Sequence, residues 1–314
     1  MLEKVPVSTP DFNSSLPTEF RVYDCLTATG FLVCFIIGLP GNCLALKYFI
    51  QTKKRNLSTV LYIVACSIDI CSSVIHLPVA FNWLNGRSFG ILGNTIFCSM
   101  WYFILLLLQQ MSMFVVMLIS VSRTIVIVYP FYEVNKKAVL MSIIVNLIYH
   151  CFWNILHFLS ASELHYNVGF CQMYSESFLN TLYQVNFSIS SGVPPIIVFL
   201  AFLVSVGKLR KSDMADESQK HNRQASITIT YFAAIFLFCN FPTFMNNALF
   251  TFTMTKYKSY PGPIYRNDFM FFYSWLLTEL FFLVLNASLN PVLYFWRMKD
   301  MRTWVLRLCG RLSH

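Results

Sequence analysis

The stretch CSMWYFILLLLQQMSMFVVMLISVSRTIVIVY, from Cys98 to Tyr129, decides the fold. It is apolar over almost its whole length, broken by two glutamines and a few hydroxyl residues, and its only charge is Arg123. A helix needs roughly 20 apolar residues to cross a bilayer, and this run is longer. The stretch therefore predicts a membrane-spanning helix with a single charge near its C-terminal end.

Composition extends this prediction to the whole chain. The 314 residues are 56% hydrophobic and only 12% charged, whereas a soluble domain carries about twice that charge. Long continuous apolar runs predict helices, because lipid offers the backbone no hydrogen-bond partners. We expect an all-α integral membrane protein, a seven-transmembrane helix bundle with spans at about 26–50, 57–84, 96–128, 138–161, 179–207, 224–254 and 269–296.

Basic residues predict the orientation of the bundle. Of the 23 Lys and Arg residues, all but Lys4, Arg21, Arg87, Lys256, Lys258 and Arg266 lie near the same ends of the predicted spans. The positive-inside rule then predicts an extracellular segment 1–25, a bundle 26–296 and a cytoplasmic tail 297–314 in the plasma membrane. Because the positive charge follows topology, we expect a lipid bilayer and no nucleic acid as the partner of this charge.

Three covalent features are expected outside the spans. Cys98 and Cys171 lie at external positions in an oxidising compartment, which predicts a disulfide. It would close a loop of roughly 70 residues, worth about 4 kcal/mol. Asn13 begins a glycosylation sequon in the external segment. Cys309 follows a basic amphipathic helix predicted to lie on the inner leaflet, and we expect it to be palmitoylated.

Polar residues gather at one depth of the predicted bundle. Asp69 lies about 18 Å from the cytoplasmic edge of its span, and three residues of other spans, Asn42, Ser112 and Asn286, lie about 16 Å from that edge. Asn290 is slightly lower. Two interpretations are open: a hydrogen-bonded network that holds the helices together, or a site for a small monovalent cation with Asp69 as its anionic ligand. Beyond such a cation, we expect no cofactor and no metal.

Two prolines mark expected hinges. Pro242 lies inside the sixth predicted span and Pro291 inside the seventh, and each removes a backbone hydrogen bond. Asn290 and Tyr294 flank Pro291 in the sequence NPVLY, so that polar groups lie beside the weakened turn. The alternative is a static kink, since proline is common in membrane helices.

These residues together resemble the rhodopsin-like (class A) G-protein-coupled receptors, of the invertebrate peptide or orphan type. The resemblance covers the chain and rests on Gly41-Asn42, Asp69, Cys98 with Cys171, Arg123, Phe236-x-x-Cys239 before Pro242, and Asn290-Pro291-x-x-Tyr294. It implies that Asp69, Ser112, Asn286 and Asn290 form a sodium pocket. It also implies that Arg123 and Tyr294 rearrange when the sixth helix swings outward to admit a heterotrimeric G protein.

Several residues depart from the pattern of that family. Ser122 stands where an acidic residue usually precedes the arginine, and Asn222 stands where a second acidic partner occurs, so Arg123 lacks both restraints. We therefore expect raised ligand-independent signalling. Asn240 replaces the usual tryptophan two residues before Pro242, and we expect its amide either to extend the polar cluster or to bond the carbonyl that the proline frees.

The residues expected to line the ligand pocket are polar but mostly neutral. Leu105 replaces the aspartate of amine receptors, which argues against an amine, while amides and aromatic rings suit peptide backbones. Glu279 is expected either to meet a basic ligand or to pair with Lys256 or Lys258. The expected pocket consists of His76, Trp101, Tyr102, Leu105, Gln109, Asn246, Asn247 and Glu279.

A receptor for an extracellular peptide, most simply a neuropeptide, is the leading functional hypothesis. An orphan chemosensory receptor for a small molecule is the alternative within the class. A transporter or channel is the alternative outside it, disfavoured because no inverted repeat or pair of broken helices appears. An enzyme is not expected, since the sequence has no nucleophile and base arrangement and no metal-ligand cluster.

Overall fold

The structure, a computed structural model, describes residues 18–52, 56–85, 95–129, 131–160, 163–167, 170–174, 178–211, 227, 230–245, 266–308 and 310. Four residues of the expected sites, Asn13, Asn246, Asn247 and Cys309, lie outside the described residues. Cys98 and Cys171 are described in their backbones only, and their predicted disulfide stays a prediction.

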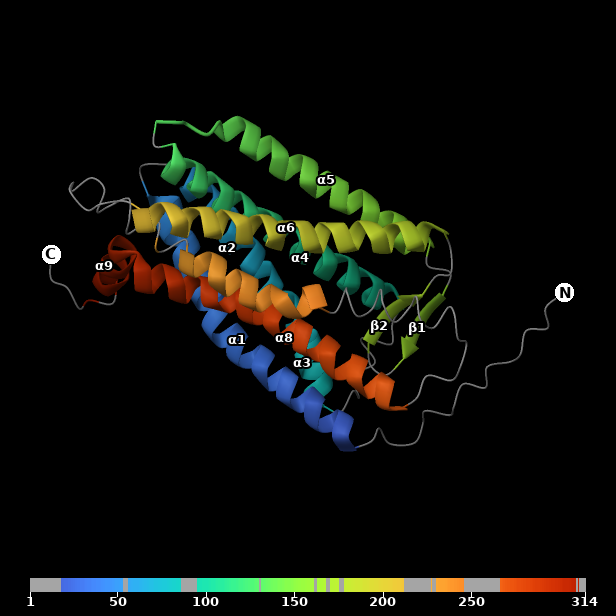
Figure 1. Cartoon of the computed structure of the whole chain (residues 1–314). Coiled ribbons are helices and arrows are strands. Elements are labelled where there is room, and N and C mark those ends of the chain that lie inside the picture. The colour runs from blue at the N-terminus through green and yellow to red at the C-terminus, as the bar shows by residue number, and fades with distance from the viewer. Residues whose placement is uncertain are drawn as a thin grey trace, which may run out of the picture.

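The described chain is a bundle of long helices (Figure 1). Six helical stretches are long and apolar enough to cross a membrane, and a shorter apolar helix, Thr230–Met245, lies between α6 and α8 in the chain. All seven coincide with the predicted spans, and the seven-transmembrane bundle is confirmed. The helices are α1 (Thr18–Gln51), α2 (Leu57–Ile75), α3 (Leu77–Leu84), α4 (Thr95–Val128), α5 (Lys136–Ser160), α6 (Phe178–Lys211), α8 (Arg266–Arg297) and α9 (Lys299–Leu308).

The second predicted span is broken at His76 into α2 and α3. Pro78 is the second residue of α3 and has no N–H to continue the ladder of α2. The indole Nε1 of Trp101 in α4 donates a hydrogen bond of 3.0 Å to the backbone oxygen of Ile75, the last residue of α2. A side chain of a neighbouring helix thus stabilises the break.

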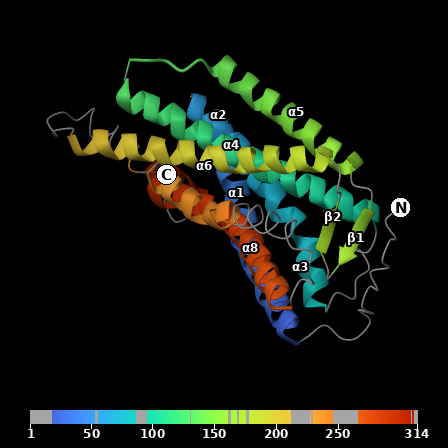
Figure 2. The same ribbon diagram turned by 45° about the vertical axis from the view of Figure 1, so that its right-hand side comes forward.

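Helices α1 and α8 pack side by side, as both views show (Figures 1 and 2). The contact is close because glycines of α1 face α8. A Cβ added at Gly38 would lie 2.6 Å from Ser288 Oγ, and one added at Gly41 would lie 2.8 Å from the ring of Pro291. Ser288 Oγ also donates to the backbone oxygen of Cys34 at 2.9 Å. Small residues and an interhelical hydrogen bond are the usual means of holding membrane helices together.

Apolar side chains fill the bundle at two levels. One cluster lies toward the end of the bundle that carries α9, called the inner end after its predicted orientation, and includes Leu61, Val115, Phe236 and Tyr294. The other lies toward the opposite end, called the outer end, and includes Phe31, Trp83, Trp101 and Leu277. Between the two clusters lies the level of Asp69. Large apolar side chains also cover the outside of α5, at Met141, Val145, Ile148 and Phe152 among others, as a lipid-facing helix requires.

A short hairpin and a short helix lie at opposite ends of the bundle (Figure 1). Strands β1 (Glu163–Asn167) and β2 (Phe170–Tyr174) pair antiparallel, and β2 contacts α4. Helix α9 is the predicted amphipathic eighth helix. Met301 on its apolar face is buried against the inner cluster, and the ring of Trp304 lies edge-on to Tyr48 of α1, with 5.6 Å between ring centroids. Part of the face expected to contact lipid therefore docks on the bundle.

Candidate functional site

Asp69 is the charged centre of the candidate site. It projects from the middle of α2 and is 2% exposed. Its Oδ2 accepts a hydrogen bond of 2.7 Å from Asn290 Nδ2, the residue before Pro291 in α8. Burying a carboxylate is costly without such partners. The expected association of Asp69 with the NPVLY segment is thus present as a direct contact between side chains.

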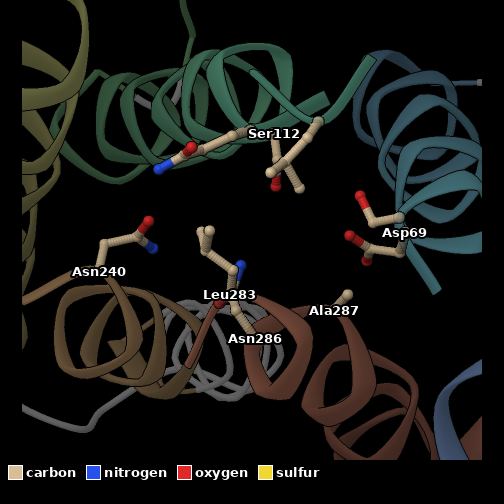
Figure 3. A pocket seen from close by; sticks show the side chains of 9 residues that line it. Asp69, Ser112, Asn240, Leu283, Asn286 and Ala287 are labelled. Atoms are coloured by element: carbon tan, nitrogen blue, oxygen red, sulfur yellow. The ribbon is translucent and has the colours of Figure 1, made fainter. Parts of the chain in front are cut away.

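A cavity of about 20 Å³ opens beside Asp69, which is room for roughly one water molecule. Figure 3 shows Ser112 of α4 opposite Asn286 of α8, with Asp69 of α2 at one side and Asn240 at the other. Its lining combines members of the expected sodium cluster with members of the expected ligand pocket. The nine described lining residues are Asp69, Ser72, Leu105, Gln109, Ser112, Asn240, Leu283, Asn286 and Ala287.

Asn42 is at the expected depth but does not line this cavity. Its Nδ2 donates a hydrogen bond of 2.9 Å to the backbone oxygen of Ala287 in α8. Ala287 lies four residues before Pro291, so its carbonyl is the one that the proline leaves without a helical N–H. Asn42 therefore supplies the missing donor one turn before Pro291 and links this part of α8 to α1.

Asn240 lines the cavity from the helix Thr230–Met245. Its Nδ2 donates 2.9 Å to the backbone oxygen of Phe236, one turn earlier in the same helix. The carbonyl that Pro242 frees is that of Phe238. The amide nitrogen of Asn240 therefore bonds neither that carbonyl nor a member of the polar cluster, which were the two expected partners. The backbone oxygen of Pro242 itself accepts a hydrogen bond from Trp275 Nε1 of α8 at 3.3 Å.

Tyr294 lies in an aromatic cluster formed by four helices. Its ring stacks on Phe232 at 5.9 Å between centroids and meets Phe49 and Tyr62 edge-on at 5.4 and 5.3 Å. Phe49 and Tyr62 stack on each other at 5.1 Å. The buried hydroxyl of Tyr294 has no hydrogen-bond partner among the described residues. We name Phe49, Tyr62, Phe232 and Tyr294 the inner aromatic cluster; the sequence analysis did not predict it.

Arg123 lies near the inner end of α4 and is half-buried. Within the described part of the chain, no group accepts a hydrogen bond from its Nε. The neighbouring Ser122 bonds the backbone oxygen of Ile119 in its own helix. Thr124 instead reaches α6, where its hydroxyl lies 3.0 Å from Ser205 Oγ. The same hydroxyl lies 3.3 Å from the backbone oxygen of Ala201, so a polar contact between α4 and α6 lies beside the arginine.

The residues expected to meet a ligand have different roles in the structure. Trp101 is buried and its indole donates a hydrogen bond to the backbone oxygen of Ile75, so it stabilises the break between α2 and α3. His76 lies at that break and packs edge-on against Phe31. Glu279 of α8 lies close enough to Tyr102 of α4 to act on it electrostatically. The other two described members, Leu105 and Gln109, line the cavity next to Asp69.

Comparison with known proteins matches most of the chain to receptors with seven transmembrane helices. A family described as 7 transmembrane receptor (rhodopsin family) matches residues 41–294. Proteinase-activated receptor 2 of Mus musculus is 24% identical, covering 94% of this chain and 73% of its own length. The uracil nucleotide/cysteinyl leukotriene receptor of Homo sapiens is 23% identical, over 93% of this chain and 79% of that receptor. The human C-C chemokine receptor type 4 is 21% identical, over 87% and 75%.

Proposed function

The chain belongs to the rhodopsin family of 7-transmembrane receptors, and on that premise we propose that it binds an extracellular peptide and activates a heterotrimeric G protein. As a G-protein-coupled receptor it is a multi-pass membrane protein and not an enzyme. We further propose that its N-terminus is extracellular and its C-terminus cytoplasmic, because the basic residues concentrate at one set of helix ends.

The observation that carries the signalling proposal is the arrangement of Tyr294 at the inner end. Its ring is held by aromatic contacts to α1, α2 and the helix Thr230–Met245, while its hydroxyl has no partner in the described structure. A polar group buried without a partner is destabilising. An outward movement of the helix Thr230–Met245 would break the Phe232 contact and let the hydroxyl find a partner. The inner aromatic cluster therefore suits a resting state in which the Phe232–Tyr294 contact holds the helix Thr230–Met245, and a ligand activates the receptor by breaking that contact.

The peptide proposal is supported by the chemistry of the outer half. Gln109 offers a buried amide nitrogen without a hydrogen-bond partner among the described residues, and Glu279 lies close enough to Tyr102 to act on it electrostatically. Amides and phenols bind peptide groups through donors and acceptors alike. The names of similar receptors refer to a proteinase, a nucleotide or leukotriene, and a chemokine, and none of these three names refers to an amine.

We also propose that the cavity beside Asp69 holds a sodium ion in the resting state. The carboxylate, the hydroxyl of Ser112 and the amide of Asn286 are oxygen ligands of the kind that hard monovalent cations prefer. The room for roughly one water molecule is of the right order for a small ion. Sodium then stabilises the receptor, and substitution of Asp69 by asparagine removes that effect.

A peptide-library screen tests the proposed function. Cells that express the chain are read through calcium and cyclic nucleotide signals, with cells that express an Arg123→Ala variant at equal surface level as the control. We expect a response that Arg123→Ala abolishes. Responses to amines or other small molecules alone would favour the chemosensory alternative. Ion flux in reconstituted vesicles without a G-protein response would favour the transporter or channel.

A further inference from the structure

The inner end of the helix Thr230–Met245 makes a second contact with α8, outside the inner aromatic cluster. The helix lies along α8 in both views (Figures 1 and 2). Phe232 is buried and stacks on Tyr294. The preceding residue, Tyr231, is 43% exposed, and its ring meets that of Trp296 in α8 edge-on at 5.5 Å between centroids. Two consecutive residues therefore join this end of the helix to α8, one in the core and one on the surface of the bundle.

The surface contact contains a cation. The guanidinium carbon of Arg297, the last residue of α8, lies 5.4 Å from the ring centroid of Tyr231 and 5.5 Å from that of Trp296. Both distances fall within the limit of about 6 Å for a cation–π contact. The positive charge of Arg297 thus contacts one ring on each of the two helices. We name Tyr231, Trp296 and Arg297 the Arg297 clamp.

The base of the clamp is held by the junction of α8 and α9. The backbone N–H of Met298 donates to the oxygen of Tyr294 at 2.8 Å, and that of Arg302 donates to the oxygen of Met298 at 3.0 Å. Helix α9 is in turn docked on the bundle through the buried side chain of Met301. The helix dipole also favours a cation at the C-terminal end of α8. The position of Arg297 is therefore defined by α8 and α9 together.

A cation–π contact made by an arginine has two properties that bear on activation. The guanidinium keeps its charge at every physiological pH, so the contact does not depend on pH. The contact is also short in range. Its two distances already lie near the limit of about 6 Å, so outward movement of the helix Thr230–Met245 by a few ångströms ends it. The Arg297 clamp therefore stabilises the resting position of the helix only.

We infer that Arg297 is a positioning residue for activation, which holds the inner end of the helix Thr230–Met245 through Tyr231 and so lowers the ligand-independent activity of the receptor. The inference rests on the proposed signalling function, and it adds a restraint on the surface of the bundle to the buried contact of Phe232. Because its partner is an aromatic ring, this restraint needs no carboxylate. An exposed cation–π contact shifts the equilibrium between resting and active states by about two- to fivefold.

Two measurements on the full-length receptor in lipid nanodiscs test the inference. The first is basal nucleotide exchange by a purified G protein, and the second is hydrogen–deuterium exchange of the amides of residues 230–235 without G protein. Arg297→Gln removes the cation, and we expect it to raise the rates of both by about two- to fivefold. The matched control is Arg302→Gln, which removes one positive charge from an exposed position of α9 and is expected to change neither rate.

Variants of Tyr231 test whether its ring is the partner of Arg297. Tyr231→Phe keeps the ring and is expected to match the unmodified receptor in both measurements. Tyr231→Leu removes the ring and is expected to raise both rates at least as much as Arg297→Gln does. In the double variant, Arg297→Gln is expected to add nothing to Tyr231→Leu, because the ring through which Arg297 acts is already gone.

The outcomes separate this inference from the proposed function. Equal amide exchange in Arg297→Gln and Arg302→Gln overturns the inference, whatever the G protein does. Faster amide exchange in Arg297→Gln, with no nucleotide exchange in any variant, supports the clamp and counts against the proposed G-protein activation instead. Additive effects in the double variant overturn the assignment of Tyr231 as the partner. Where Arg297→Gln does not fold, Tyr231→Leu and Tyr231→Phe decide, and equal rates in these two overturn the inference.

Discussion

Replacing Phe232 with leucine is expected to raise the ligand-independent activity of the receptor about two- to tenfold. Phe232 is 4% exposed and stacks on Tyr294 across the boundary between the helix Thr230–Met245 and α8. Leucine keeps the apolar contact and loses the ring pair, which is worth about 0.5–1.5 kcal/mol beyond area burial. That energy favours the resting state only, because outward movement of the helix breaks the pair. Since about 1.4 kcal/mol changes an equilibrium tenfold, the active fraction rises by the stated factor.

The assay is guanine-nucleotide exchange by a purified G protein in membranes that contain equal amounts of each variant. The matched control is Phe238→Leu in the same helix. Phe238 is 63% exposed and meets Phe282 edge-on at 5.3 Å, away from Tyr294. We expect Phe238→Leu to leave basal exchange unchanged. Unchanged basal exchange in Phe232→Leu, at normal expression, would refute the assignment of the inner aromatic cluster as a restraint on activation.

Three further predictions concern other parts of the molecule. Ser122→Asp supplies the carboxylate that Arg123 lacks and is expected to lower basal G-protein activation, while the uncharged Ser122→Asn does not; equal basal levels would count against it. Gly38→Val places a Cβ 2.6 Å from Ser288 Oγ and 3.1 Å from Ser288 Cα. Overpacking of this kind costs about 1–3 kcal/mol of folding stability, so we expect the melting temperature to fall by several degrees. The control is Gly192→Val, where nothing lies within 4 Å, and an equal loss in both contradicts the close packing of α1 on α8. Peptide mapping without reduction is expected to recover Cys98 joined to Cys171. Cys171→Ser is expected to reduce surface expression, whereas Cys71→Ser, which removes a free and exposed thiol, is not. Recovery of Cys98 as a free thiol would contradict the disulfide.

The depth of a residue in the bundle could be predicted from the sequence, but the direction of its side chain could not. Counting helical rise from the cytoplasmic edge placed Asp69, Asn42 and Asn286 at one level. Two of the three line the cavity, and Asn42 turns instead toward the carbonyl of Ala287. Rise fixes height alone, and the rotation of each helix about its axis is decided by packing. The fold itself was predictable because every span exceeds the length that a bilayer needs.

Partners drawn from several helices were the least predictable feature. Trp101 was expected to meet a ligand, yet its indole is used by the backbone of Ile75 at the α2–α3 break. Phe49, Tyr62 and Phe232 gave no signal, because the chain has 31 Phe and 16 Tyr residues and no local pattern distinguishes these three. Their role depends on the meeting of four helices at Tyr294, which no single segment encodes.

The close packing of α1 on α8 has a mechanical consequence. Gly38, Gly41 and the Asn42–Ala287 hydrogen bond join the two helices along the segment that contains Pro291. The two helices are therefore held together over the stretch that contains Pro291. We expect α1 and α8 to keep their relative positions during the proposed activation, so that α1 can serve as the reference for measuring the movement of the helix Thr230–Met245.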